Sequence, residues 1–229
     1  MLNFEQMQEL WQARRRGVPF GDIAVMKFAM LSKAPPGLNE RLVELGNGCF
    51  DVDFEALRRL PAGTLGREYA RMLDERGLQP LEVTAETRER FKANPYPLRY
   101  TATHDLFHVL TGFSTTPAGE LGLFAFMIAQ GFDVGSRMQL WATIFAYSWI
   151  VPLHLPGMLR NMRLGTAMGK KAKNLLLQPL ESCLSEPLDV LRKRFDLPNP
   201  EHVGMAKGHS SLVFDWVQKI TTPPRRAAA

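Results

Sequence analysis

Apolar residues recur three and four positions apart along most of the chain, and this spacing is the strongest constraint on its fold. In the segment FEQMQELWQARRR, residues 4–16, Phe4, Met7, Leu10 and Trp11 share one helical face. Comparable helical segments occupy residues 21–33, 38–48, 64–78 and 85–94. Strand-length runs rich in Val, Ile and Thr are scarce. We therefore predict an all-α protein, a single-domain multi-helix bundle.

The length of the chain sets its domain organisation. The 229 residues fit one domain and are ample for a sizeable core. We expect residues 1–60 to form an N-terminal helical segment that packs on the core, and residues 61–220 to form that helical core. The remaining segment, TTPPRRAAA at residues 221–229, is typical of a disordered tail.

The charge balance is mildly basic, with 28 Lys and Arg against 23 Asp and Glu, a net charge of +5. This excess suits an anionic lipid surface or an acidic ligand. No nucleic-acid-binding motif and no long basic stripe with interleaved aromatic residues is present in the sequence. We therefore predict no nucleic-acid partner.

Cysteine usage and the N-terminal residues indicate the compartment. Cys49 and Cys183 are far apart and form no CxxC pair, which argues against a disulfide scaffold and suits a reducing compartment. The first residues show no apolar run with a cleavage site, and they include Glu5 and Glu9, which transit peptides avoid. We expect a cytoplasmic protein.

Two stretches lack charged residues, at positions 121–132 and 138–159. The second approaches the ~20 residues of a membrane span. Because Pro152, His154 and Pro156 interrupt its last third, a buried or membrane-touching helix is the better interpretation. Seven large apolar side chains in this region are candidates for the wall of an apolar lipid-binding groove, with ordinary core packing as the alternative: Phe124, Phe126, Met127, Met138, Trp141, Phe145 and Trp149.

The segment THDLFHVLTGFSTTPAGE, residues 103–120, contains the candidate functional residues. On a helix over residues 99–111, His104 and His108 lie one turn apart on the same face, a spacing that lets two imidazoles reach one metal ion. Asp105 is adjacent to His104. The pattern leaves three roles open for it: a third ligand, a partner that orients a ligand, or a general base.

A second helix brings a further acidic group into reach of the histidines. Thr116 is a good N-cap and Pro117 a good first helical residue, so Glu120 falls in the first turn of the next helix. Two histidines with one or two carboxylates suit zinc or iron(II). The alternative is a pair of ordinary core histidines, but four ionisable groups beside so many apolar residues are costly to bury without a shared cation.

The pattern His-Asp-x-x-His, eleven residues, then Glu resembles the signature of the coenzyme Q biosynthesis protein 4 family. The segment LGREYARMLDERGL resembles an upstream helix of that family, and residues 155–197 resemble its basic and C-terminal helices. The resemblance covers residues 64–197. It implies His104, Asp105, His108 and Glu120 as metal ligands, and we add a catalytic role for Asp105.

The same resemblance implies a function. Family members act on polyprenylated benzoquinone precursors and are implicated in replacing the C1 carboxylate by a hydroxyl. This predicts a metal-dependent decarboxylase that is peripheral on the inner membrane face, is a homodimer, and associates with other ubiquinone-biosynthesis proteins. The head group requires an anion partner, for which we predict Arg160, Arg163 and Lys170, in a basic cluster with Lys171 and Lys173. A solvated helix face or contact with lipid headgroups are the alternatives for that cluster.

Two other functions compete with this one. The first is a non-catalytic lipid-binding organiser that holds the quinone precursor and its partner enzymes. The second is a metal-dependent hydrolase of phosphate esters. That hydrolase is expected to have further histidine ligands, and His154, His202 and His209 do not form a helical ligand pair.

Overall fold

The structure, a computed structural model, describes residues 4–46, 49–78, 81–132 and 154–206. Within these ranges the chain forms helices and no strand, which confirms the predicted all-α class. The α-helices are α1 (Phe4–Arg15), α2 (Phe20–Leu31), α3 (Leu38–Glu44), α4 (Phe54–Arg58), α5 (Leu65–Arg76), α6 (Ala85–Arg90), α7 (Tyr96–Thr111), α8 (Pro117–Ala129), α10 (Leu155–Lys171), α11 (Leu188–Arg194) and α12 (Pro200–Val203). Two 3-10 turns, η2 (Leu175–Leu177) and η3 (Leu180–Cys183), follow α10.

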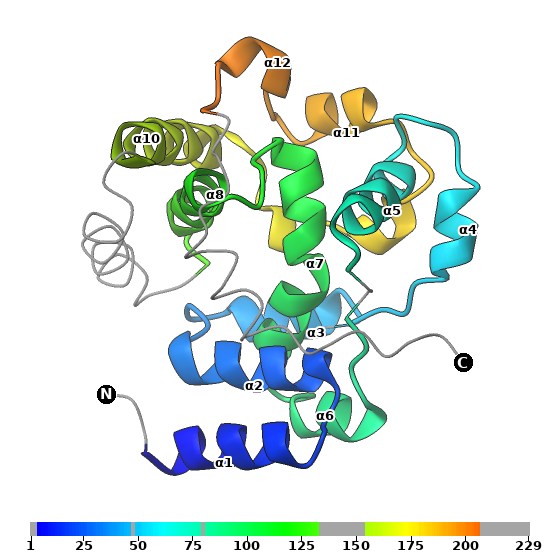
Figure 1. The fold of residues 1–229 in the computed structure, drawn as a ribbon, viewed down its shortest axis with the longest axis vertical. Helices are drawn as coiled ribbons and strands as arrows, with labels where there is room; N and C mark the ends of the chain where they lie inside the picture. Colours follow the sequence, from blue (N-terminus) through cyan, green and yellow to red (C-terminus); the bar gives the residue numbers. More distant parts are fainter. Residues whose placement is uncertain (1–3, 47–48, 79–80, 133–153, 207–229) are drawn as a thin grey trace.

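Helix α7 occupies the centre of the bundle (Figure 1), with α5 on one side, α8 and α10 on the other, and α2 at its N-terminal end. Its Leu106, Phe107 and Leu110 are fully buried in the main core. Phe28 of α2 stacks on Tyr100 of α7, with ring centroids 3.7 Å apart. The central helix therefore has neighbours on several sides, which fixes the direction of each of its faces.

A buried arginine ties α7 to the C-terminal part of the chain. The side chain of Arg99 is inaccessible to solvent and donates hydrogen bonds to the carbonyl oxygens of Leu176 and Gln178. Its guanidinium also lies 2.8 Å from the Glu181 carboxylate. Because a buried charge is costly unless it is paired and hydrogen-bonded, these contacts explain how Arg99 is accommodated in the core.

Helices α8 and α10 approach each other at glycines. A Cβ atom placed on Gly165 of α10 would lie 2.0 Å from the carbonyl oxygen of Gly122 of α8, and one on Gly169 would lie 2.4 Å from that of Phe126. The side-chain amide of Asn161 donates to the carbonyl oxygen of Ala118, in the first turn of α8. The absent side chains allow α10 to hold α8 closely against the core.

The helices agree with the sequence patterns in part. Gly77 ends α5 at a φ of 58°, as predicted for its C-cap. Helix α7 begins at Tyr96 rather than Arg99, because Pro97 is tolerated in the first helical turn, where backbone N–H groups lack helical partners. The five-residue α4 was not predicted; its Asp53 cap is the available signal. Trp11 is 59% exposed, contrary to the expected apolar face, and carries the Arg15 guanidinium over its ring.

The proposed groove residues divide into three sets. Phe126 and Met127 belong to the buried core, because α8 is enclosed between α7 and α10, so the core alternative holds for them. Phe124 is half-buried and packs against the core. Met138, Trp141, Phe145 and Trp149 lie outside the described residues, as does the predicted tail. Among the helices that can be described, none is both long and apolar enough to span a bilayer.

Candidate metal centre

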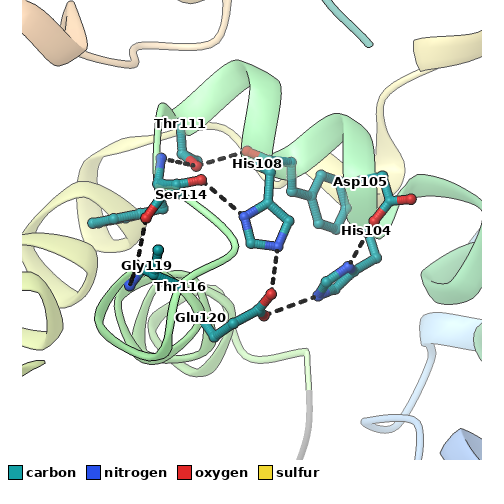
Figure 2. Close-up of polar contacts among 10 residues, drawn as sticks. His104, Asp105, His108, Thr111, Ser114, Thr116, Gly119 and Glu120 are labelled. Atoms are coloured by element: carbon teal, nitrogen blue, oxygen red, sulfur yellow. Dashed lines mark hydrogen bonds and ion pairs between the residues drawn. The ribbon is translucent and has the colours of Figure 1, made fainter. Parts of the chain in front are cut away.

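The link between α7 and α8 brings their facing residues together. Helix α7 ends at Gly112, whose φ of 80° lies in the left-handed region that glycine tolerates best. Helix α8 starts with the predicted cap: the Thr116 hydroxyl accepts a hydrogen bond from the N–H of Gly119, and Pro117 is the first helical residue. The short connection folds α8 back, so Glu120 faces α7 as predicted (Figure 2).

His108 is held so that one ring nitrogen points at Glu120. Its Nδ1 lies 2.9 Å from the carbonyl oxygen of Phe113, and since a carbonyl only accepts, Nδ1 carries the proton. Its Nε2 is buried, has no hydrogen-bond partner among the residues that the structure describes, and lies 3.4 Å from Oε1 of Glu120. The Nε2 lone pair is therefore available to a cation.

His104 presents its Nε2 to the same point. Its Nδ1 lies 3.3 Å from Oδ1 of Asp105, while its Nε2 lies 3.9 Å from Oε2 of Glu120. The two imidazole rings are 4.9 Å apart between centroids and meet at 76°. One ligand atom each from His104, His108 and Glu120 fall within 4.8 Å of one another. These three side chains fit around a single ion.

Asp105 occupies a different position from the other three. The structure places it at Nδ1 of His104, on the opposite side of the ring from the converging nitrogens (Figure 2). In the part of the chain that the structure describes, it is not a member of the group whose ligand atoms meet. Carboxylates in this place typically fix the orientation of a ligand histidine. Of the three roles left open for Asp105, this contact matches the orienting one.

The pKa values of His108, Asp105 and Glu120 depend on the charges of their neighbours in this centre. Burial by itself lowers the pKa of His108, but the facing Glu120 carboxylate outweighs it, so this pKa lies above its usual value. Burial raises the pKa of Glu120, and the charge of His108 more than reverses this. The pKa of Asp105 is likewise low, because contact with His104 exceeds the effect of burial. The acids are therefore ionised at neutral pH.

The composition and exposure of this centre fit a divalent metal. Two imidazoles and one carboxylate form a set found with zinc and with iron(II), and both metals leave positions for water or substrate. His108 is almost fully buried, whereas 26% of the His104 side chain and 35% of the Glu120 side chain remain exposed. Solvent therefore reaches the centre at His104 and Glu120 more than at His108.

Comparison with known proteins identifies the family. A profile described as "Coenzyme Q (ubiquinone) biosynthesis protein Coq4" matches residues 50–201, two thirds of the chain. The chain belongs to the coenzyme Q biosynthesis protein 4 family. This confirms the resemblance drawn from the motif, and it leaves α1, α2 and α3 outside the matched region.

Individual members of the coenzyme Q biosynthesis protein 4 family support the assignment. The homologue from Nematostella vectensis is 34% identical over 152 residues, which cover 64% of this chain and 71% of that protein. One from Aspergillus fumigatus is 31% identical over 158 residues, covering 63% of this chain and 50% of that one. Both carry "mitochondrial" in their names, whereas the N-terminal residues had suggested the cytoplasm.

A solved structure supports the fold. The crystal structure of a protein from Nostoc punctiforme that is named for ubiquinone biosynthesis aligns with a TM-score of 0.57 at 22% identity. The alignment covers 83% of this chain and 93% of the other. The helical arrangement is therefore shared beyond the region of the family match.

A cavity of about 320 Å³ borders His108, whereas His104 and Glu120 do not line it. Its walls come from α5, the end of α7, the loop after Gly112, α11 and α12. Its charged lining residues are Glu68, Arg71, Glu75, Arg76, Arg192 and Glu201. The size is typical of a small-molecule site. Sequence reasoning missed this cavity, because its walls are distant in the chain and carry no motif.

The arginines of this cavity are engaged to different extents. Arg71 pairs with Glu68 and Glu75, and Arg192 donates to the carbonyl oxygens at the end of α7. No ion pair with another described residue holds Arg76, and its charge helps to lower the pKa of Asp105. Among the described residues, Arg76 is therefore the wall arginine that a bound anion can engage without breaking an ion pair or one of the hydrogen bonds to α7.

The basic cluster predicted from the sequence lies elsewhere. Arg160, Arg163 and Lys170 are exposed on α10, and none of them lines the cavity beside His108. The Arg160 guanidinium instead lies close to Gly204. Their predicted contact with a substrate head group stays a prediction.

Proposed function

We propose that this chain is a divalent-metal-dependent enzyme of ubiquinone biosynthesis. Its substrate is a polyprenylated benzoquinone precursor, and its reaction replaces the C1 carboxylate by a hydroxyl. The observation that carries the metal site is the buried Nε2 of His108, which has no hydrogen-bond partner in the described part of the chain and is directed at Glu120 beside the Nε2 of His104. Membership of the coenzyme Q biosynthesis family supports the pathway.

Each residue of the centre has a distinct task in this proposal. His104, His108 and Glu120 hold the metal. The Phe113 carbonyl and the Asp105 carboxylate fix the two rings so that both Nε2 atoms face Glu120. A bound divalent metal supplies Lewis-acid stabilisation of charge on the substrate's oxygens, and iron(II) also supplies redox chemistry that zinc lacks.

The cavity beside His108 supports binding of the head group. A carboxylated ring placed there meets the apolar side chains of Met72, Phe113 and Leu188 and the guanidinium of Arg76. Arginine is well suited to carboxylate recognition, because its planar fork matches the two oxygens. We therefore propose Arg76 as the partner of the substrate carboxylate, with the α10 cluster as the competing assignment.

The polyprenyl tail of the proposed substrate determines where the enzyme meets it. A long apolar chain partitions into a bilayer, since each buried methylene is worth about 0.8 kcal/mol. The protein therefore takes its substrate at a membrane surface, where the net charge of +5 favours anionic lipid. Other ubiquinone-biosynthesis enzymes are the expected partners there.

Metal content and turnover test this function. Elemental analysis of the wild type should show one divalent metal per chain, and the double variant His104→Ala, His108→Ala should lose it. Replacing a carboxylate by a hydroxyl is a two-electron oxidation, so the assay supplies dioxygen with zinc- or iron-loaded protein and a carboxylated polyprenyl precursor. Release of carbon dioxide supports the enzyme. Binding of the precursor without turnover, with either metal, points instead to the organiser.

A further inference from the structure

The loop between α7 and α8 holds His108 in place, and it is itself packed against glycines of α8. The Phe113 carbonyl that accepts the Nδ1–H of His108 is followed directly by Ser114. A Cβ atom on Gly119 would lie 1.8 Å from the carbonyl oxygen of Ser114 and 2.5 Å from its carbon. A Cβ on Gly122 would lie 2.5 Å from the Phe113 ring. Any side chain at these two positions displaces the loop.

The closest atoms at Gly119 belong to the backbone of Ser114, and the Ser114 hydroxyl oxygen follows at 2.6 Å. The hydroxyl of Ser114 is also bonded to that of Thr116, 2.7 Å away, which caps the same turn of α8. The loop can therefore move away from a side chain at position 119 only if the Phe113 carbonyl also moves relative to the His108 ring. This ring orientation directs the buried Nε2 of His108 at Oε1 of Glu120, and that nitrogen has no hydrogen-bond partner among the described residues.

We propose that Gly119 and Gly122 are positioning residues for the metal centre. By letting the loop lie directly on α8, they keep the Phe113 carbonyl at Nδ1 of His108 and thereby hold the ring with Nε2 toward Glu120. Helix α8 thus carries one ligand itself and orients a second ligand through the loop. This inference rests on the proposed metal site, but the orientation of His108 can be measured without metal.

The decisive variant is Gly119→Ala, read by two measurements. The first is the ¹⁵N NMR spectrum of the His108 ring in metal-free protein, at a pH where the ring is neutral. We expect the Nδ1-protonated form in the wild type and a mixture of tautomers in the variant. The second is zinc affinity by chelator competition, which should fall by about 10- to 100-fold, as for the loss of an orienting partner.

Two glycines of α10 provide matched controls. Of the described residues, a Cβ on Gly157 would meet the Ala206 methyl group alone, at 3.2 Å, so Gly157→Ala should leave the tautomer and the zinc affinity unchanged. A Cβ on Gly165 would meet backbone atoms of Gly122 and Phe126 in α8 and not the loop that holds His108. Gly165→Ala should lower stability while the Nδ1-protonated form of His108 persists. If Gly119→Ala and Gly165→Ala behave alike in the NMR experiment, the glycines act through general packing and the proposal fails.

The remaining outcomes also decide the question. If Gly119→Ala does not fold, Gly122→Ala is the substitute, because it displaces the Phe113 ring rather than backbone. A folded variant at either position with wild-type tautomer and zinc affinity overturns the proposal. If the wild type binds no divalent metal, the proposed function fails, and the NMR comparison still decides whether these glycines orient His108.

Discussion

Nε2 of His108 and Oε1 of Glu120 lie 3.4 Å apart, although the two residues belong to different helices and have eleven residues between them. Without metal, each charge stabilises the other, which raises the pKa of His108 and lowers that of Glu120. With metal, the same two atoms become ligands. Protons and metal therefore compete for one site, and this competition makes the centre testable in solution.

Metal binding should release protons near neutral pH. Because Glu120 raises the pKa of His108, part of the His108 population is protonated there and must lose its proton to bind metal. Zinc affinity should therefore rise with pH until the pH passes the raised pKa of His108, and then level off. Calorimetry in buffers of different ionisation enthalpy measures the released protons. An affinity that is independent of pH from 5 to 8 would contradict the assignment.

The same pair makes a pH-dependent contribution to the stability of the metal-free protein. The raised pKa of His108 gives stabilisation that is lost as pH rises through that pKa, and the lowered pKa of Glu120 gives stabilisation that is lost as pH falls through its own. In Glu120→Gln the contribution of Glu120 vanishes, and His108 loses the largest of the effects that raise its pKa. Urea unfolding of the metal-free proteins should show the largest difference from wild type between the two pKa values, and an equal difference at all pH values would disprove the coupling.

Asp105→Asn tests the orienting role of the carboxylate. An amide accepts more weakly than a carboxylate at Nδ1 of His104, and it can also turn its NH₂ group toward the ring. Zinc affinity should fall by about 10- to 100-fold, and loss of Glu120 as a ligand should cost more. The comparison of Asp105→Asn with Glu120→Gln by chelator competition separates the roles. Equal losses in the two variants would instead support direct ligation by Asp105.

Arg76→Gln and Arg160→Gln distinguish two head-group sites. If the cavity beside His108 binds the substrate carboxylate, Arg76→Gln should weaken binding of a carboxylated precursor by about 10-fold or more, which corresponds to about 1.4 kcal/mol. Arg160→Gln should have little effect on that binding, although it removes the same charge from the surface. Fluorescence titration with precursors that carry or lack the carboxylate provides the measurement. A larger loss of binding in Arg160→Gln than in Arg76→Gln would instead assign the head-group site to α10.

Arg99→Leu should destabilise the fold without affecting the metal ligands directly. It removes a fully buried cation and leaves Glu181 and two carbonyl oxygens without their donor. Breaking a buried pair in this way typically costs about 3–5 kcal/mol. Glu181→Gln should cost less, because 26% of the Glu181 side chain is exposed to water. The free energies of unfolding in urea test this order, and a greater loss in Glu181→Gln would contradict it.

The sequence by itself determined the features that depend on neighbouring residues. The helical class follows from the apolar spacing. The C-terminus of α5 follows from Gly77, and the N-terminus of α8 follows from Thr116 and Pro117. The convergence of His104, His108 and Glu120 was also predictable, since one helical turn and one short loop separate them. Over such distances the backbone geometry leaves few alternatives.

Only the tertiary structure decided which faces of these helices meet other parts of the chain. It buried Phe126 between α7 and α10, where a groove had been considered, and it paired Arg99 with residues more than seventy positions away. It placed Asp105 on the ring of His104, and it built the cavity beside His108 from α5, α11 and α12. Helical spacing shows that a residue lies on an apolar or polar face. What covers that face depends on contacts between distant segments, and local sequence patterns carry no information about those contacts.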